Sequence, residues 1–197
     1  MSEFNRHLDH YRNHWTQHFS CLVSESNWGD KDAAALYLER YWLCESEYNS
    51  VWKAVQNSIF TNQSAGLPDS IFSNEYEVLC QPGGCLFDRD DFDRLKSCLS
   101  NIGDDHLIII ENTFGGMLEE PAFRFKFPAK ISWDELIAGN YISAVVFGSL
   151  YKEFFVFGKS ASWGKYSAAD EDSPLDVLGF KKDQAPLFKR QFALKGI

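Results

Sequence analysis

The sequence has no long apolar run and no recognisable leader. Nothing in it approaches the ~18 uninterrupted apolar residues that a membrane-spanning helix needs. Its first residues, MSEFNRHLDHYRNHW, are polar from the start and do not show the charged-then-apolar order of a signal peptide. We therefore expect a cytoplasmic protein that has no membrane partner.

Basic residues are scarce relative to acidic ones. Lysine and arginine number 19 against 28 aspartates and glutamates, which gives a formal net charge of −9. Such a charge repels the phosphates of nucleic acids and attracts a basic protein, whose association it accelerates at low salt. We therefore expect no nucleic-acid partner and favour a protein partner.

The motifs that mark common catalytic and cofactor sites are also missing. There is no GxxxxGK[ST] loop for phosphates, no GxGxxG after a strand, no GxSxG elbow and no EF-hand series of acids. These absences predict a protein that is not an enzyme, with no catalytic residues and no cofactor.

Five cysteines are present, an odd number with irregular spacing, which favours reduced thiols over a disulfide framework. Cys80 and Cys85 flank the turn sequence QPGG and resemble half of a zinc knuckle, but no second pair of ligands follows at a suitable spacing. A catalytic pair of Cys85 with His106 lacks an orienting residue. We expect Cys80 and Cys85 to be small strand residues.

The chain does contain enough apolar surface for one compact core. It has 197 residues, of which 45% are hydrophobic and 16% are aromatic. We expect a single domain over residues 1–197. Its first part, residues 1–62, is predicted to be helical, and its second part, residues 67–197, is predicted to contain a sheet.

The helical part is predicted to form two long helices that pack as an antiparallel pair. The first, over about residues 3–23, carries an apolar stripe with spacings of three and four. The second begins after Asp30, which can cap it, and continues for roughly seven turns. Its apolar stripe consists of Tyr37, Tyr41, Cys44, Tyr48, Val51, Val55 and Ile59.

From residue 67 the pattern becomes that of a mostly antiparallel (mixed) sheet with one or two further helices. The predicted strands are EYEVLCQPGGCLF, HLIIIEN, AFRFKF, YISAVVFGSL and YKEFFVFG. DRDDFDRLKSCLSNIG is a predicted helix that Gly103 ends. SWDELIAG is a short helix capped by Ser132, with Glu135 at the capping-box position. The sequence thus predicts an α+β fold, with the N-terminal helical pair packed with this sheet.

Four histidines, His7, His10, His14 and His18, line one flank of the first predicted helix. Two of them one turn apart could hold zinc with ligands from elsewhere, although no HExxH glutamate stands between them. Histidines that pack beside the edge of a core while staying hydrated are the more common arrangement. We assign no metal site and keep metal binding as an alternative.

Two acidic stretches are candidate partner-binding surfaces. One is the start of the helix near residue 88, where Asp90, Asp91 and Asp93 also suit the helix dipole. The other, WGKYSAADEDSP, is predicted to be an exposed loop whose rings anchor a partner and whose acids steer it. Its candidate residues are Trp163, Tyr166, Asp170, Glu171 and Asp172. In the alternative arrangement the two rings fold over the sheet and cover the core.

The longer stretch around that loop, YKEFFVFGKSASWGKYSAADEDSPLDVLGF, resembles the C-terminal part of bacterial immunity proteins. The resemblance rests on a strand, a glycine-containing turn, Trp-Gly-x-Tyr, the acidic loop and the closing Pro-Leu-Asp-x-x-Gly-Phe. Immunity proteins of this kind are small cytoplasmic α+β proteins paired with polymorphic or contact-delivered toxins. The resemblance implies that the chain binds one cognate toxin, such as a basic nuclease, and blocks it without catalysis.

Other functions stay open on the sequence alone. A small-molecule binding or regulatory module would hold its ligand between the helical pair and the sheet. A metal-binding protein would use the histidine row. A structural subunit of a larger assembly would use the exposed loop as a permanent contact, and homo-oligomer formation stays open as well.

Overall fold

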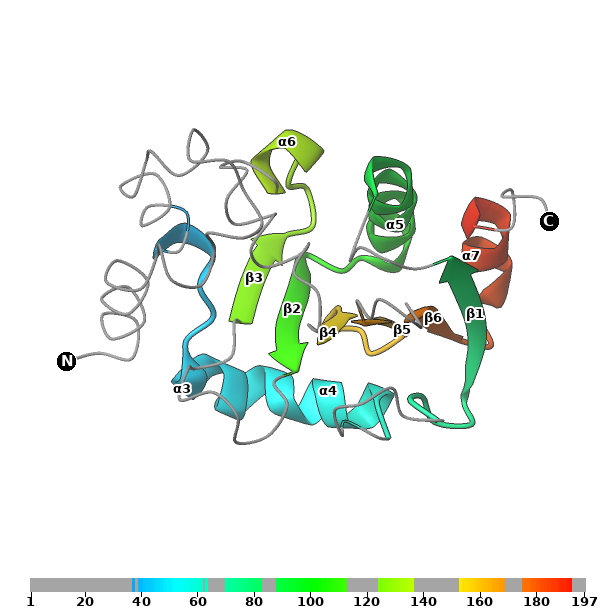
Figure 1. Cartoon of the computed structure of the whole chain (residues 1–197), viewed down its shortest axis with the longest axis horizontal. Helices are drawn as coiled ribbons and strands as arrows, with labels where there is room; N and C mark the ends of the chain where they lie inside the picture. Colours follow the sequence, from blue (N-terminus) through cyan, green and yellow to red (C-terminus); the bar gives the residue numbers. More distant parts are fainter. Residues whose placement is uncertain are drawn as a thin grey trace.

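Figure 1 shows the computed structural model of the chain. The structure describes residues 37, 39–61, 63, 70–82, 88–112, 124–136, 153–168 and 175–192. This part of the chain forms helices and a six-stranded antiparallel sheet, so the predicted α+β class is confirmed.

The sheet has the strand order β1-β6-β5-β4-β2-β3, and every neighbouring pair is antiparallel. The strands are β1 (Tyr76–Pro82), β2 (His106–Asn112), β3 (Arg124–Pro128), β4 (Glu153–Phe157), β5 (Trp163–Ala168) and β6 (Leu175–Lys181). Among the described strands, the first in sequence therefore lies beside the last. This order places β1 at one edge of the sheet and β3 at the other.

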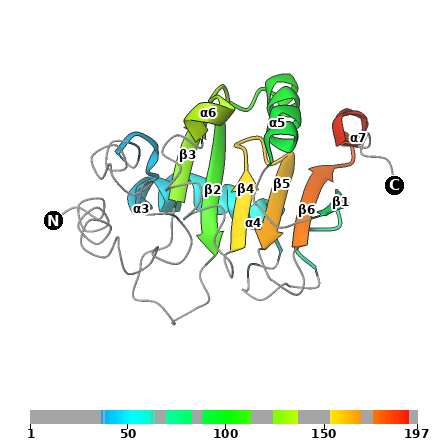
Figure 2. The ribbon, with the colours of Figure 1, turned by 45° about the horizontal axis from the view of Figure 1, so that its top comes forward.

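Helices cover both faces of the sheet (Figures 1 and 2). The helices α5 (Arg89–Ile102), α6 (Trp133–Leu136) and α7 (Ala185–Phe192) lie on one face. The consecutive segments α3 (Glu45–Glu47), η2 (Tyr48–Trp52) and α4 (Lys53–Ile59) lie on the other. Along β2, Leu107 and Ile109 join the core beneath α5, whereas Ile108 and Ile110 join the core beneath α4. Burial on both faces explains why this strand is an uninterrupted apolar run.

The ends of α5 and α6 are set by local sequence, as predicted. At the start of α5 the Asp88 carboxylate accepts a hydrogen bond from the Asp91 amide at 2.7 Å. Gly103 ends the same helix in the left-handed region, with φ of 84°. The Ser132 hydroxyl accepts from the Glu135 amide at 3.1 Å and so caps α6. Each contact spans a single turn, so sequence spacing alone predicts it.

The second long helix was predicted to be continuous to Ile59, and this prediction is wrong. The chain is helical at Tyr41 but leaves the helix at Trp42, and it re-enters after Cys44, whose ψ of 154° is extended. Trp42 forms an isolated β-bridge with Phe125, and the Leu43 amide donates to the Arg124 carbonyl at 2.9 Å. The backbone of Trp42 and Leu43 therefore pairs with the edge strand β3, and this pairing interrupts the helix.

The apolar stripe of that helix is also shifted. Val51 was placed on the buried stripe but is 39% exposed, and Trp52 is buried in its place together with Gln56 and Ile59. The π-helical turn of η2 rotates the residues that follow relative to an ordinary α-helix. After Tyr48, the next residue to face the core is therefore Trp52 and not Val51.

The segment WGKYSA was predicted to belong to an exposed loop, and this prediction is wrong as well. It forms β5, in which every residue is buried. The run LDVLGFK forms β6, and the basic stretch that follows forms α7, two elements that the sequence patterns did not indicate. β5 lies between β4 and β6 and is buried on both faces. Its sequence therefore does not alternate between apolar and polar residues, and its glycine, lysine and serine resemble those of a loop.

Several predictions lie outside the described residues. They are the first helix over 3–23 with its four histidines, the antiparallel packing of two helices, the strand at 141–150, Cys85, and the acidic residues at 170–172. Among the helices that the structure describes, none is long and apolar enough to cross a membrane.

Candidate functional site

The first turns of α5 carry the first group of predicted partner-binding acids. Asp90 and Asp93 are exposed and so are available to a partner. Asp91 is buried, and its prediction as a surface residue is wrong, because it lies on the helix face that packs onto the sheet. Charge of this sign is stabilised at the start of a helix by the unpaired amide groups of the first turn.

Beneath this helix start lies an ion pair that the sequence did not reveal. The Lys165 ammonium of β5 donates to the Asp176 carboxylate of β6 at 2.8 Å, and both side chains are 4% exposed. The direct cross-strand partner of Asp176 is Ser167, and Lys165 precedes Ser167 by two residues, so Lys165 and Asp176 lie diagonally opposite on the same face of the sheet. Among the described residues, the second carboxylate oxygen of Asp176 has no hydrogen-bond partner.

The environment of Asp176 couples this pair to α5. Burial is the largest influence and raises the pKa of Asp176 to about 6, while the charge and hydrogen bond of Lys165 oppose the rise. The charges of Asp91 and Asp88 raise it further. Asp88 and Asp91 therefore lie close enough to Asp176 to act on its charge. The start of α5 and the start of β6 form one acidic corner of the molecule.

The raised pKa of Asp176 predicts a distinct pH dependence of stability. The ordinary pKa of Asp176, 3.8, applies in the unfolded state, so the folded state binds the Asp176 proton more tightly. The free energy of unfolding therefore falls as pH rises between about pH 4 and about pH 6. We expect a contribution on the order of 3 kcal/mol across this interval. The double variant Lys165→Met with Asp176→Leu lacks it.

Urea unfolding of wild type and the double variant over this pH range measures the effect. The difference between the two free energies of unfolding changes with pH, while all other titrating groups cancel. A difference that stays flat from about pH 4 to about pH 6 would contradict the assignment to Asp176.

Trp163 lies in the core and not on a loop, so its predicted role as an exposed anchor is wrong. Its ring is fully buried, and its Nε1 donates to the Asp104 carboxylate at 2.9 Å. The backbone amide and hydroxyl of Ser160 donate to the same carboxylate at 2.8 and 2.7 Å. Gly158 is required beside them, because a Cβ there would lie 2.2 Å from Asp104 Oδ2. These contacts fix the β4–β5 turn.

Tyr166 is likewise fully buried, on the opposite face of β5, so its predicted surface role is wrong too. Its ring packs 5.3 Å from that of Phe155, measured between centroids. The alternation of a strand sends neighbouring side chains to opposite faces, and here both faces are covered. The tertiary fold has therefore placed one predicted anchor in each of the two cores.

The remaining predicted acids, Asp170, Glu171 and Asp172, lie outside the described residues. The strand residues on either side of them are described. Ala168 of β5 and Leu175 of β6 are direct cross-strand partners, and Leu175 precedes Asp176.

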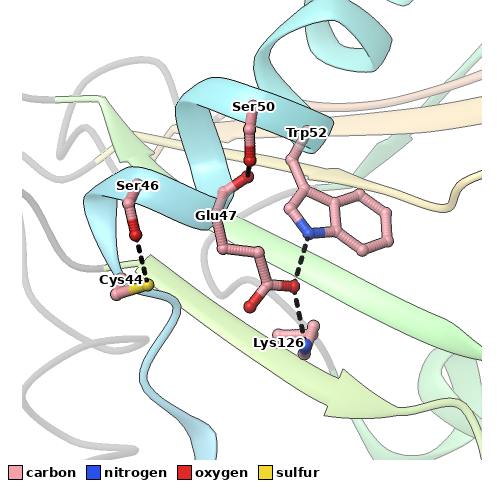
Figure 3. Close-up of polar contacts among 6 residues, drawn as sticks. All are labelled: Cys44, Ser46, Glu47, Ser50, Trp52 and Lys126. Atoms are coloured by element: carbon pink, nitrogen blue, oxygen red, sulfur yellow. Dashed lines mark hydrogen bonds and ion pairs between the residues drawn. The ribbon is translucent and has the colours of Figure 1, made fainter.

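A second cluster of polar side chains lies on the other face, where α3 meets β3 (Figure 3). One oxygen of the Glu47 carboxylate accepts from the Lys126 ammonium at 2.7 Å and from Trp52 Nε1 at 3.1 Å. Burial raises the pKa of Glu47, but these two hydrogen bonds and the charges of Lys126 and His106 outweigh it and lower the pKa overall. The ionised Glu47 joins the helix to the edge strand.

Cys44 lies beside this cluster at the start of α3. Its Sγ is 3.2 Å from the Ser46 hydroxyl, as Figure 3 shows. The hydrogen bond from Ser46 is the main cause that lowers the pKa of this thiol, and backbone amides contribute as well. Together with Cys80 and Cys98, it is one of the described cysteines that form no disulfide.

The chemistry of metal binding finds no support in the part of the chain that the structure describes, where no three His, Cys, Asp or Glu side chains form a group that could hold a metal ion. Comparison with known proteins gave no match to a family model, to a curated protein or to a solved structure. The acidic corner is the candidate functional site because it combines exposed carboxylates with a buried ion pair.

Proposed function

We propose that the chain is an immunity-like protein that binds and neutralises a basic protein toxin through the acidic corner. The observation that carries the proposal is the electrostatic coupling of Asp176 to Asp88 and Asp91. This coupling links the start of α5 to the start of β6, which are far apart in the sequence. A convergent set of carboxylates is the surface that suits a basic active site, such as that of a nuclease.

The chemistry of the proposed surface differs from that expected of an aromatic anchor. Trp163 and Tyr166 are withdrawn into the cores, and Asp91 is buried. We therefore assign recognition to the exposed Asp90 and Asp93, and keep Asp170, Glu171 and Asp172, between β5 and β6 in the sequence, as part of the proposal. Exposed carboxylates act chiefly on the rate of encounter, because their attraction extends over about a Debye length in water.

The double variant Asp90→Asn with Asp93→Asn tests this proposal. We expect it to lower the association rate with the toxin about tenfold at low salt and to weaken the dependence of that rate on salt, with little change in dissociation. A matched control, Asp134→Asn with Asp183→Asn, removes the same charge from exposed positions on α6 and before α7. The control should bind as wild type does.

The toxin itself is obtained by capture on wild-type protein at low salt, with both variants as parallel baits. A supporting result is a basic protein that arrests growth when expressed alone, is neutralised by co-expression with this chain, and is retained by the control but not by the Asp90/Asp93 variant. Equal retention by all three baits would place the interface elsewhere. Capture of a protein without toxicity would contradict the immunity function.

A further inference from the structure

The two edge strands of the sheet, β1 and β3, differ in whether other backbone of the described chain covers their outer side. The outer edge of β3 is covered by the chain itself, through the bridge of Trp42 to Phe125 and the hydrogen bond from Leu43 to Arg124. The Arg124 guanidinium holds this cover in place, since it lies 5.6 Å from the ring of Trp42 and 5.7 Å from that of Tyr48. In contrast, β1 pairs with β6 alone among the described strands.

The open edge strand β1 also lacks the usual protection against pairing. Natural sheets block free edges with lysine, bulges or inward-pointing charges. In β1 there is no lysine, its pairing with β6 runs without a bulge, and proline occurs only at its last position, Pro82. Val78 is 51% exposed, and Cys80 next to it on the same face is exposed as well. The seven residues of β1 therefore offer a flat strand with an apolar side.

Charge at this edge is already neutralised within the chain. The one charged residue of β1, Glu77, forms an ion pair with Lys189 of α7 at 2.5 Å. The acidic corner, by comparison, carries several carboxylates around a single buried lysine. A basic partner is thus drawn to the corner, whereas the β1 edge suits a partner strand of little net charge.

We propose that β1 pairs antiparallel with β1 of a second copy of this chain, about a two-fold axis at Leu79, so that the two sheets join into one. Directly opposite side chains in a sheet lie on the same face, and a two-fold axis perpendicular to the sheet keeps each side chain on its face. Opposite residues must therefore be an even number of positions apart in the sequence, and the axis passes through one residue and its copy. With the axis at Leu79, Val78 lies opposite Cys80 of the second copy and Glu77 lies opposite Gln81. Tyr76 then lies opposite Pro82.

This register is the one that matches the chemistry of each cross-strand pair. Val78 and Cys80 combine an apolar side chain with a small one, and Glu77 stands opposite a residue that carries no like charge. An axis at Glu77 would place two carboxylates directly opposite, which destabilises a pair of strands. An axis at Val78 would set Glu77 against the apolar Leu79. Self-complementarity favours the second copy over an unrelated strand.

The area and charge of this joint predict a weak dimer that salt strengthens. A strand pair of this length buries on the order of 1,000 Å², at the lower limit for a specific interface, so the dimer dissociates on dilution. Each copy carries a net charge of −9, and screening of their repulsion favours association. Binding of a basic toxin at the acidic corner has the opposite salt dependence, so the two interactions are distinguishable and this one does not rest on the other.

Sedimentation of the full chain over a range of concentrations, at low and high salt, tests the dimer. Val78→Lys should raise the dissociation constant at least about tenfold, because it brings charge to both sides of the joint. Val51→Lys is the matched control, since Val51 is also a large apolar residue that is exposed among the described residues, and it lies in η2, away from β1. A monomer under all conditions, or equal effects of the two variants, would overturn the proposal.

Cross-linking tests the register independently. The variant Val78→Cys, which keeps the native Cys80, should form a covalent dimer on oxidation, because directly opposite strand residues lie within disulfide range. Val78→Cys with Cys80→Ser should not, since its new cysteine faces serine. Equal cross-linking of these two variants, or a wild-type dimer linked through Cys80 to Cys80, would overturn the axis at Leu79.

Discussion

Replacement of Trp163 by alanine is expected to lower the free energy of unfolding by about 3–5 kcal/mol. The ring is fully buried in the core beneath α5, so its removal leaves a cavity in a closely packed region. It also removes one of the donors to the Asp104 carboxylate, which is itself buried. A loss of this size is a large part of the stability of a typical domain, about 5–15 kcal/mol.

Urea unfolding followed by circular dichroism measures this loss. Trp163→Phe keeps most of the buried volume but not the donor, so we expect a smaller loss of about 1–2 kcal/mol. Trp133→Ala serves as control, because Trp133 is only partly buried where it packs on Phe92. If Trp163→Ala left stability unchanged and abolished binding of a partner, the ring would belong to an exposed loop after all.

Removal of one member of the Lys165–Asp176 pair is the second large effect. Lys165→Met is expected to cost about 3–5 kcal/mol at about pH 7, because it leaves the Asp176 carboxylate buried without a counter-charge and close to Asp91. Lys165→Met with Asp176→Leu should recover most of that loss, since an apolar pair of similar volume needs no charge.

The acid response of the single variant gives a further signature. Without Lys165, the pKa of Asp176 rises further, so the carboxyl takes up a proton and Lys165→Met regains stability as pH falls from about 7 toward about 5. Lys189→Met is the matched control, because the Lys189–Glu77 pair is largely exposed and should contribute less than about 1 kcal/mol. Equal losses for Lys165→Met and Lys189→Met would show that burial of the first pair has no energetic consequence.

The buried pair explains why the acidic corner has a defined shape. The charge of Asp91 on α5 acts on Asp176 on β6, and Lys165 supplies the positive charge that pairs with Asp176. The proposed toxin interface is therefore close to a buried ion pair that contributes to stability. We expect toxin binding and the free energy of unfolding to change with pH over the same range.

Elements whose ends depend on neighbours in sequence could be predicted well. The start of α5 at Asp88, its end at Gly103 and the cap of α6 at Ser132 each rest on contacts within a single turn. The strand β2 was recognised from its continuous apolar run, and β3 from its alternation, with Arg124 and Lys126 on one face.

The errors arose where distant residues decide the outcome. β5 contains glycine, lysine and serine and was taken for a loop, because the partner that makes a buried Lys165 acceptable, Asp176, stands on another strand. The break at Trp42 follows from the edge of β3, which offers a carbonyl to Leu43. Neither partner is visible in a local window of sequence.

By itself, the sequence determined the α+β class, the local ends of the central helices and strands, and the excess of negative charge. Only the tertiary structure decided which residues are buried: it put Trp163 and Tyr166 in two separate cores and gathered Asp88, Asp91 and Asp176 at one corner. Among the described strands, it gave β1 only β6 as a partner, whereas the outer edge of β3 is covered at Trp42 and Leu43. The physical reason is that caps and alternation are local, whereas burial and charge pairing depend on the order of the strands.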